Sequence, residues 1–172
     1  MRFFSLFNLP VSFEVNLELL QERYRELQKA VHPDHHATGS EGEKLLAIQK
    51  ASEVNDAYET LKKPLSRAEY MVFEHGFDVR HEQATIKDGM FLMQQMELRE
   101  ELEDVANADD VETALDDFYD DVKRLISEYT QQFEQDFQQA SYDKAADAVR
   151  KLRFIYKLKE EAQQLEDKLL DF

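Results

Sequence analysis

Residues 16–61 read NLELLQERYRELQKAVHPDHHATGSEGEKLLAIQKASEVNDAYETL, and this stretch decides the fold. It holds two helical patterns, each with apolar residues at three- and four-residue spacing along one face. Asn16 and Ser40 stand where N-caps are needed, and Ser40 opens a capping-box pattern. Between the patterns, Pro33 fixes its own φ and keeps His32 out of helical geometry. The stretch therefore predicts two helices joined by a short polar loop.

Shorter helices are expected at either side of this pair. One covers residues 3–7 and ends before Pro10, and another runs from Pro64, which suits a first helical turn, to Gly76. Residues 1–75 are therefore predicted to form one small helical domain. The expected core stripes of its two long helices are Leu17, Leu20, Tyr24, Leu27 and Val31, and Ala47, Ala51, Val54, Tyr58 and Leu61.

The second half of the chain predicts three further helices. Residues 76–84, GFDVRHEQA, resemble a linker in composition, and beyond Gly89 the chain contains neither glycine nor proline. Because short turns between long helices imply antiparallel neighbours, residues 85–172 are predicted to form an up-down-up three-helix bundle. The expected helices cover residues 85–106, 110–138 and 141–171. The whole chain is thus expected to be all-α.

The composition excludes several classes of function. The chain has 172 residues, a formal net charge of −16 and no cysteine. It therefore lacks thiolate zinc sites and cysteine nucleophiles, and its charge would repel nucleic-acid phosphates. No apolar run could span a bilayer, no signal peptide is evident, and no glycine-rich phosphate loop or GxSxG motif occurs. We expect a cytoplasmic protein that is not an enzyme, needs no cofactor and binds neither nucleic acid nor membranes.

The predicted loop holds a candidate binding site. His32, Pro33 and Asp34 place an imidazole and a carboxylate in a fixed relation, and the carboxylate could accept charge-assisted hydrogen bonds from a partner. Taken alone, the tripeptide is better explained as a helix stop followed by a turn aspartate; within a four-helix pattern, the binding role is favoured. His32, His35 and His36 have spacings that could ligate a metal, but no cysteine or patterned carboxylate completes a site, so we expect surface histidines.

A basic strip leads up to this loop on the first long helix. Arg25, Lys29 and His32 follow one another at i, i+4 and i+7, and Arg23 flanks them. Basic side chains on an acidic protein suit steering toward a negative partner surface. The alternative is an ordinary solvated helix face.

These residues resemble the J domain of co-chaperones. The resemblance rests on Lys29-Ala30-Val31-His32-Pro33-Asp34, on Val54-Asn55-Asp56-Ala57-Tyr58-Glu59-Thr60-Leu61, on Pro64 and on Arg67-Ala68-Glu69-Tyr70. It implies that residues 1–75 recruit and activate a DnaK-type chaperone ATPase. In one place the chain departs from the family pattern, because His35 and His36 stand where a lysine and an aromatic residue are common.

The second half narrows the resemblance to the HscB family. The stretches that carry it are Phe91-Leu92-Met93, Glu97-Leu98-Arg99-Glu100-Glu101-Leu102, Lys151-Leu152-Arg153-Phe154 and Leu165-Glu166-Asp167-Lys168-Leu169-Leu170-Asp171-Phe172. The resemblance runs the whole length of the chain. It implies that an HscA-like chaperone and an IscU-like iron–sulfur scaffold protein are the partners.

The helix at 85–106 carries the second candidate site. Its predicted core stripe is Phe91, Leu98, Leu102 and Val105, so the other side should be solvent-exposed. Methionines in such an exposed apolar spot suit adaptable binding, and acidic residues surround it. The resemblance implies that this face, with an aromatic residue of the last helix, binds the scaffold. The expected set, with side chains pointing away from the core, is Leu92, Met93, Met96, Glu97, Glu100, Asp104 and Phe154.

Two alternatives to the scaffold site stay open. The apolar spot could pack under the first domain, or the protein could be a generic J protein whose bundle mediates dimerisation or binds another client. The scaffold hypothesis predicts a monomer with this spot exposed. Dimerisation predicts the spot buried in a symmetric interface.

Overall fold

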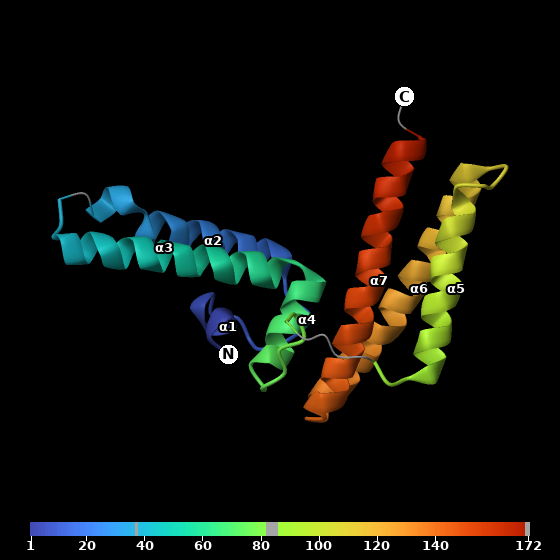
Figure 1. Ribbon diagram of the computed structural model, residues 1–172. Coiled ribbons are helices and arrows are strands. Elements are labelled where there is room, and N and C mark those ends of the chain that lie inside the picture. The colour runs from blue at the N-terminus through green and yellow to red at the C-terminus, as the bar shows by residue number, and fades with distance from the viewer. Residues whose placement is uncertain (37, 82–85, 171–172) are drawn as a thin grey trace. The chain divides into compact units, whose positions relative to one another are not determined.

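The structure, a computed structural model, describes residues 1–36, 38–81 and 86–170, and every regular element in them is a helix (Figure 1). The all-α prediction is confirmed. Contacts divide the chain into two compact units, Met1–Glu74 and His75–Phe172. The helices are α1 Arg2–Leu6, α2 Leu17–Val31, the 3-10 helix η1 Pro33–His36, α3 Glu41–Lys62, α4 Pro64–Phe73, α5 Gly89–Val105, α6 Val111–Gln138 and α7 Tyr142–Leu169.

The first unit is built on the antiparallel pair α2 and α3 (Figure 1). Both predicted N-caps form, since the side chain of Asn16 accepts a hydrogen bond from the Leu19 amide at 3.1 Å and Ser40 accepts one from the Glu43 amide at 3.2 Å. Most of the predicted stripe residues are buried or half-buried, and Leu20 is fully buried. Leu17 differs, because it lies in the first turn of α2 and is 52% exposed.

Arginine side chains fasten the short elements of the first unit to this pair. Arg23 of α2 donates from Nη1 to the carbonyl oxygens of Phe7 and Asn8, at 2.8 and 2.6 Å, and so holds the end of α1. Arg2 of α1 contacts Glu53 of α3 at 2.8 Å. The buried Arg67 of α4 donates to the Leu61 carbonyl oxygen at 2.8 Å. Arg23 therefore has a structural role that the sequence pattern did not indicate.

The last helix of the first unit is shorter than predicted. α4 ends at Phe73, where the Glu74 amide donates to the Tyr70 carbonyl oxygen at 3.1 Å. A turn follows, and Gly76 adopts a φ of 95°, in the left-handed region that favours glycine. Part of the predicted linker, residues 82–84, lies outside the described residues. In the part that is described, Val79 is only 3% exposed.

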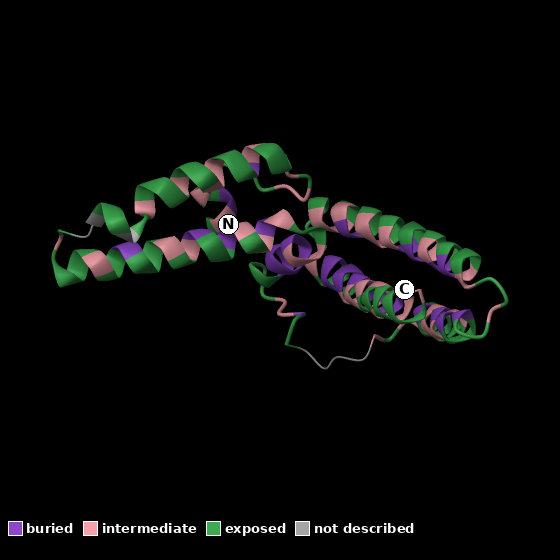
Figure 2. Cartoon of the chain, turned by 90° about the horizontal axis from the view of Figure 1, so that it is seen from above, coloured by how far each residue is buried: buried purple, intermediate pink, exposed green. Residues whose placement is uncertain are grey.

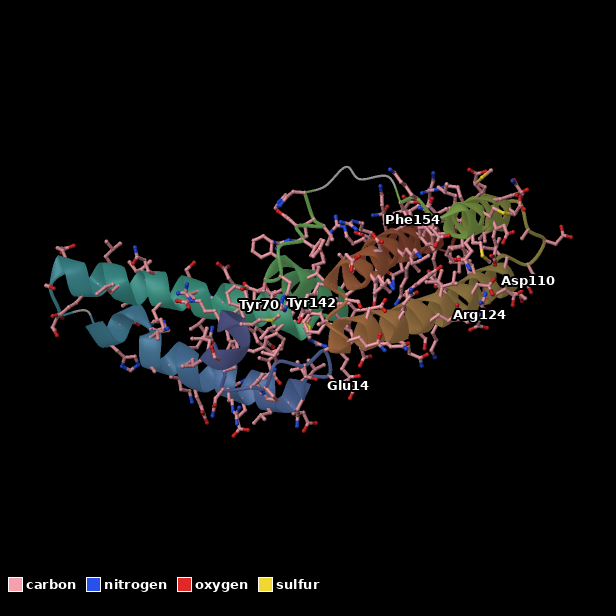
Figure 3. The ribbon with its side chains drawn as sticks, turned by 90° about the horizontal axis from the view of Figure 1, so that it is seen from below. Glu14, Tyr70, Asp110, Arg124, Tyr142 and Phe154 are labelled. Atoms are coloured by element: carbon pink, nitrogen blue, oxygen red, sulfur yellow. The ribbon has the colours of Figure 1, made fainter. Side chains whose placement is uncertain are left out.

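The second unit contains the predicted three helices. α6 and α7 pack along their lengths, and α5 lies against this pair (Figure 1). Figure 2 shows buried positions following one side of each helix, with exposed positions on the other. Asp110, labelled at the start of α6 in Figure 3, caps that helix by accepting from the Thr113 amide at 3.2 Å. The core cluster contains Phe91, Leu98, Leu102, Phe118, Val122, Leu125, Ile155, Leu158 and Ala162.

The start of α5 differs from the predicted one and is fixed by a side chain. Asp88 accepts hydrogen bonds from the amides of Met90 and Phe91 at 3.1 and 3.2 Å, so the helix begins at Gly89. Its other carboxylate oxygen receives Lys151 of α7 at 2.7 Å. Lys151 is 9% exposed and also lies 5.7 Å from the centre of the Phe91 ring. These contacts set both the position and the rotation of α5 on the bundle.

Carboxyl groups meet where α5 packs on α6. The pKa of Glu101 is raised to about 7. Burial is the largest cause, and a hydrogen bond with Asp121 and repulsion from Asp121 and Asp117 raise it further. Arg124 approaches Asp121 to 3.8 Å and offsets part of this repulsion. The α5–α6 contact is therefore more favourable when Glu101 carries its proton.

We expect Glu101→Gln to stabilise the protein at pH 8. The folded state keeps the Glu101 proton up to about pH 7, whereas the unfolded state loses it near 4.5, so the wild type loses stability as pH rises between these values. The amide keeps a neutral hydrogen-bonding group at all pH values. Because water partly screens the site, we expect a gain of about 1–2 kcal/mol. Urea unfolding at pH 5 and pH 8 measures it, and an equal gain at both pH values would contradict this account.

Candidate functional site

The loop between α2 and α3 has the geometry that Pro33 imposes. His32 caps α2 with a φ of −58° and a ψ of 132°, well outside helical values, and η1 follows at once. The backbone amide of Asp34 donates to Nδ1 of His32 at 3.2 Å, so the imidazole closes the turn. The Asp34 carboxylate lies 3.5 Å from the same nitrogen and is 90% exposed. The loop thus places the Asp34 carboxylate beside His32 and leaves it open to a partner.

The basic strip beside the loop is narrower than the sequence indicates. Arg25 and Lys29 are exposed on α2, and His32 follows them. Arg23 is half-buried and is engaged with carbonyl oxygens of the α1 end. The strip available to a partner is therefore Arg25, Lys29 and His32.

The histidines of the loop do not form a recognised metal centre among the described residues. The ring centres of His32 and His35 are 6.4 Å apart, with the rings perpendicular. No group of three histidine, cysteine, aspartate or glutamate residues suited to a metal occurs within residues 1–36, 38–81 and 86–170. The side chain of His36 lies outside what the structure describes.

The outer face of α5 carries an exposed apolar strip. Leu92, Met93 and Met96 are 43%, 63% and 72% exposed, and Met90 extends the strip with 79%. Sequence reasoning missed Met90, although its three-residue spacing from Met93 places it on the same side of the helix. The strip faces solvent because Phe91, Leu98 and Leu102, on the opposite side, hold α5 in the core.

Acidic side chains border this strip. Glu97, Glu100 and Asp104 are all exposed on α5, as the sequence predicts. The residues from 76 to 172 carry 13 of the 16 net negative charges, with 12 basic and 25 acidic residues. A partner for this face should therefore present apolar and basic groups together.

Phe154 occupies a different position from the one expected. Its side chain does not point away from the core but packs, half-buried, against the core cluster. The ring centre lies 5.9 Å from that of Phe91, and the Arg99 guanidinium carbon is 5.8 Å above it (Figure 3 labels Phe154 on α7). Phe154 therefore packs against the core side of α5, and only part of its ring is open to a partner.

The described helices include none that is both long enough and apolar enough to span a membrane.

Both halves of the chain match known family models. Residues 7–70 match the DnaJ domain, and residues 87–163 match the HSCB C-terminal oligomerisation domain. Two relatives are the Co-chaperone protein HscB homologs of Vibrio campbellii and Photobacterium profundum. The first is 52% identical over 99% of both chains, and the second is 51% identical over 99% of this chain and 100% of the relative.

Solved structures agree with these matches. Chaperone HscB from Vibrio cholerae is 46% identical and has a TM-score of 0.86, over 98% of this chain and 99% of the other. Human co-chaperone protein HscB is 33% identical with a TM-score of 0.85, over 95% of this chain and 81% of the other. Sequence, domain order and fold agree along the whole length, and the chain therefore belongs to the HscB family of J-domain co-chaperones.

Proposed function

We propose that this protein stimulates the ATPase of an HscA-like, DnaK-type chaperone and delivers an IscU-like iron–sulfur scaffold protein to it. The observation that carries the proposal is the Asp34 carboxylate, which is 90% exposed in a loop closed by His32. The domain match supports this role for the loop, because J domains act on DnaK-type chaperones. The protein itself would bring no catalytic group and would work in the cytoplasm.

The loop acts by differential binding. A carboxylate held in place can accept charge-assisted hydrogen bonds from basic or polar groups of the chaperone. If those groups are better placed in the hydrolysing state, binding shifts the chaperone population toward that state. Arg25 and Lys29, exposed on the helix that leads to the loop, would speed the encounter with a negative chaperone surface.

The outer face of α5 is the proposed scaffold site. Leu92, Met93 and Met96 supply adaptable apolar contacts, while Glu97, Glu100 and Asp104 form an acidic rim. Phe154 contributes chiefly by holding α5 and Arg99 in place. Burying the exposed strip against a partner would remove apolar surface from water, which is the main source of affinity at such a spot.

Dimerisation through the bundle is the second candidate function. The description of the matched family model as an oligomerisation domain favours it. It would use the same strip, because no larger group of exposed apolar residues is found on the described part of the second unit. Sedimentation of the free protein separates the two, since we expect a monomer over the micromolar range.

Replacing Asp34 by Ala should abolish stimulation of the chaperone ATPase. The carboxylate is exposed, so helicity and thermal stability should stay unchanged. A titration of ATPase rate against co-chaperone concentration measures the effect. Asp56→Ala, which removes another exposed carboxylate in the same unit, should stimulate normally. Full stimulation by the Asp34 variant would contradict the proposed mechanism.

Reversing the charge of Arg25 and Lys29 to Glu should slow chaperone association and weaken its dependence on salt. Exposed charges act mainly on the association rate. At physiological ionic strength, salt screens their attraction over distances greater than about 8 Å. Stopped-flow association at several salt concentrations measures this. Lys123→Glu/Lys144→Glu changes the net charge equally on the other unit and should have little effect. If the wild-type association rate did not depend on salt, the strip would have no steering role.

Replacing Leu92 and Met96 by Ala should weaken scaffold binding by about tenfold or more, equivalent to about 1.4 kcal/mol. Both side chains are exposed, so the variant should fold, and its basal ATPase stimulation should be normal. Only the additional stimulation by added scaffold should disappear. Calorimetry measures the affinity, with Leu169→Ala, a 38% exposed residue near the end of α7, as the control. Unchanged affinity would place the scaffold on another face.

A further inference from the structure

Three of the five methionines of the chain lie together on the outer face of α5. Met90, Met93 and Met96 follow one another at three-residue spacing, and their exposed fractions are between 63% and 79%. Met71 of the first unit is, in contrast, only 1% exposed. The thioethers of α5 are therefore open to small reagents dissolved in the surrounding water.

The methionine thioethers are also the only sulfur groups of the protein, because the chain has no cysteine. In proteins that contain exposed, low-pKa cysteines, those thiols are the usual targets of oxidants. Here no thiol of the same molecule competes for an oxidant. Peroxide chemistry is therefore concentrated on α5, with the half-buried Met1 as a further accessible thioether.

Hydrogen peroxide converts a methionine thioether into the sulfoxide. A sulfur lone pair attacks one peroxide oxygen, and the O–O bond breaks as the S–O bond forms. The departing hydroxide takes the proton of the transferred hydroxyl group and leaves as water. Sulfur loses two electrons and the peroxide gains them. Methionine sulfoxide reductases reverse the change, using two thiols for each sulfoxide and forming a disulfide and water.

On this face the sulfoxide would meet unfavourable neighbours. Its oxygen is a hydrogen-bond acceptor, and burying it against a partner without a donor is costly. Glu97 lies one helical turn after Met93, and Glu100 lies one turn after Met96, and both carboxylates are exposed. Ionised carboxylates accept hydrogen bonds and donate none, so they cannot satisfy the new oxygen. Oxidation therefore adds acceptors to an apolar strip that acceptors already border.

The fold should tolerate this change. α5 is held in the core by Phe91, Leu98 and Leu102, on the side opposite the methionines, and by the contact of Asp88 with Lys151. The methionines are not part of the core cluster. Their oxidation therefore alters a binding surface and leaves the packing of the bundle intact.

We propose that Met90, Met93 and Met96 form a redox-sensitive modification site, at which peroxide turns the scaffold-binding face into a polar form that does not bind and a sulfoxide reductase restores it. The inference rests on the proposed function, because it specifies how that face is regulated. The His32-Pro33-Asp34 loop belongs to the other unit and carries no sulfur. The oxidised protein should therefore still stimulate the chaperone but no longer present the scaffold to it.

The experiment compares scaffold affinity before and after oxidation. The full chain is treated with hydrogen peroxide, catalase removes the remaining peroxide, and peptide mass spectrometry measures the sulfoxide at each methionine. We expect extensive oxidation at Met90, Met93 and Met96 and little at the buried Met71. Calorimetry with untreated scaffold should then show an affinity loss of at least about tenfold, because the strip now carries polar groups without partners. Sulfoxide reductases with dithiothreitol should restore the affinity to within about twofold.

Two variants isolate the thioethers. Met90→Leu/Met93→Leu/Met96→Leu keeps apolar side chains of similar volume but has no sulfur on α5. Whatever its starting affinity, peroxide should leave that affinity unchanged. Met93→Gln/Met96→Gln places a polar carbonyl near the position of each sulfoxide oxygen and should lower scaffold affinity by about tenfold without any oxidant. Far-ultraviolet circular dichroism and thermal unfolding check that each protein is folded.

Binding and oxidation should also oppose each other in the reverse direction. A scaffold bound on the strip covers the thioethers, so saturating scaffold should slow sulfoxide formation at Met93 and Met96. Met1, in the first unit, provides the reference rate in the same sample and corrects for peroxide that the scaffold consumes. An equal rate with and without scaffold would contradict the proposed site.

The outcomes separate the inference from the proposed function. Unchanged scaffold affinity after oxidation at all three positions would overturn the inference, as would an equal loss in the peroxide-treated leucine variant, while Leu92→Ala/Met96→Ala still weakened binding. Loss of helicity on oxidation would overturn it as well, because the effect would then lie in folding. Failure of the untreated protein to bind the scaffold would instead overturn the proposed scaffold site, and the inference with it.

Discussion

The backbone constraint at Pro33 is the one on which the first unit depends. It forces a ψ of 132° on His32, ends α2 and starts the 3-10 turn that redirects the chain into α3. Because the turn is closed by the bond from the Asp34 amide to His32 Nδ1, that nitrogen is occupied, while the Asp34 carboxylate is exposed to solvent. The same residue that stops the helix therefore determines which functional group reaches the solvent.

In the second unit, the corresponding role belongs to the pair of Asp88 and Lys151. Asp88 fixes the first turn of α5 and at the same time binds a nearly buried lysine of α7. Breaking one partner of such a pair would leave the other charge without compensation, which is costly in a shielded site. The rotation of α5 follows from this pair and from Phe91, and the rotation decides that Leu92, Met93 and Met96 face outward.

The charges of the two units suit different tasks. The first unit places its basic groups Arg25 and Lys29 in one row near the loop, so they act together although the chain is acidic. The second unit concentrates acidic residues, and at the α5–α6 contact burial, followed by the neighbouring Asp121, raises the pKa of Glu101. Repulsion between carboxyl groups at the α5–α6 contact accompanies the high acidic content of this unit.

The sequence alone determined the helices, the loop and both candidate surfaces. These features are local: helical periodicity, the caps at Asn16 and Ser40, and the break at Pro33. Each depends only on residues close together in the chain, so each can be recognised without the tertiary structure. The outward turn of Leu92, Met93 and Met96 followed from their spacing relative to Phe91 and Leu98. Membership of a family followed from motifs spread along the whole chain.

The tertiary structure decided what spacing cannot encode, namely which neighbouring element covers each side chain. The sequence placed Arg23 in a basic strip. In the structure, its guanidinium instead donates hydrogen bonds to carbonyl oxygens at the end of α1. Phe154 was expected on the surface and instead packs on Phe91. Spacing also gave no sign that the nearly buried Lys151 would bind Asp88.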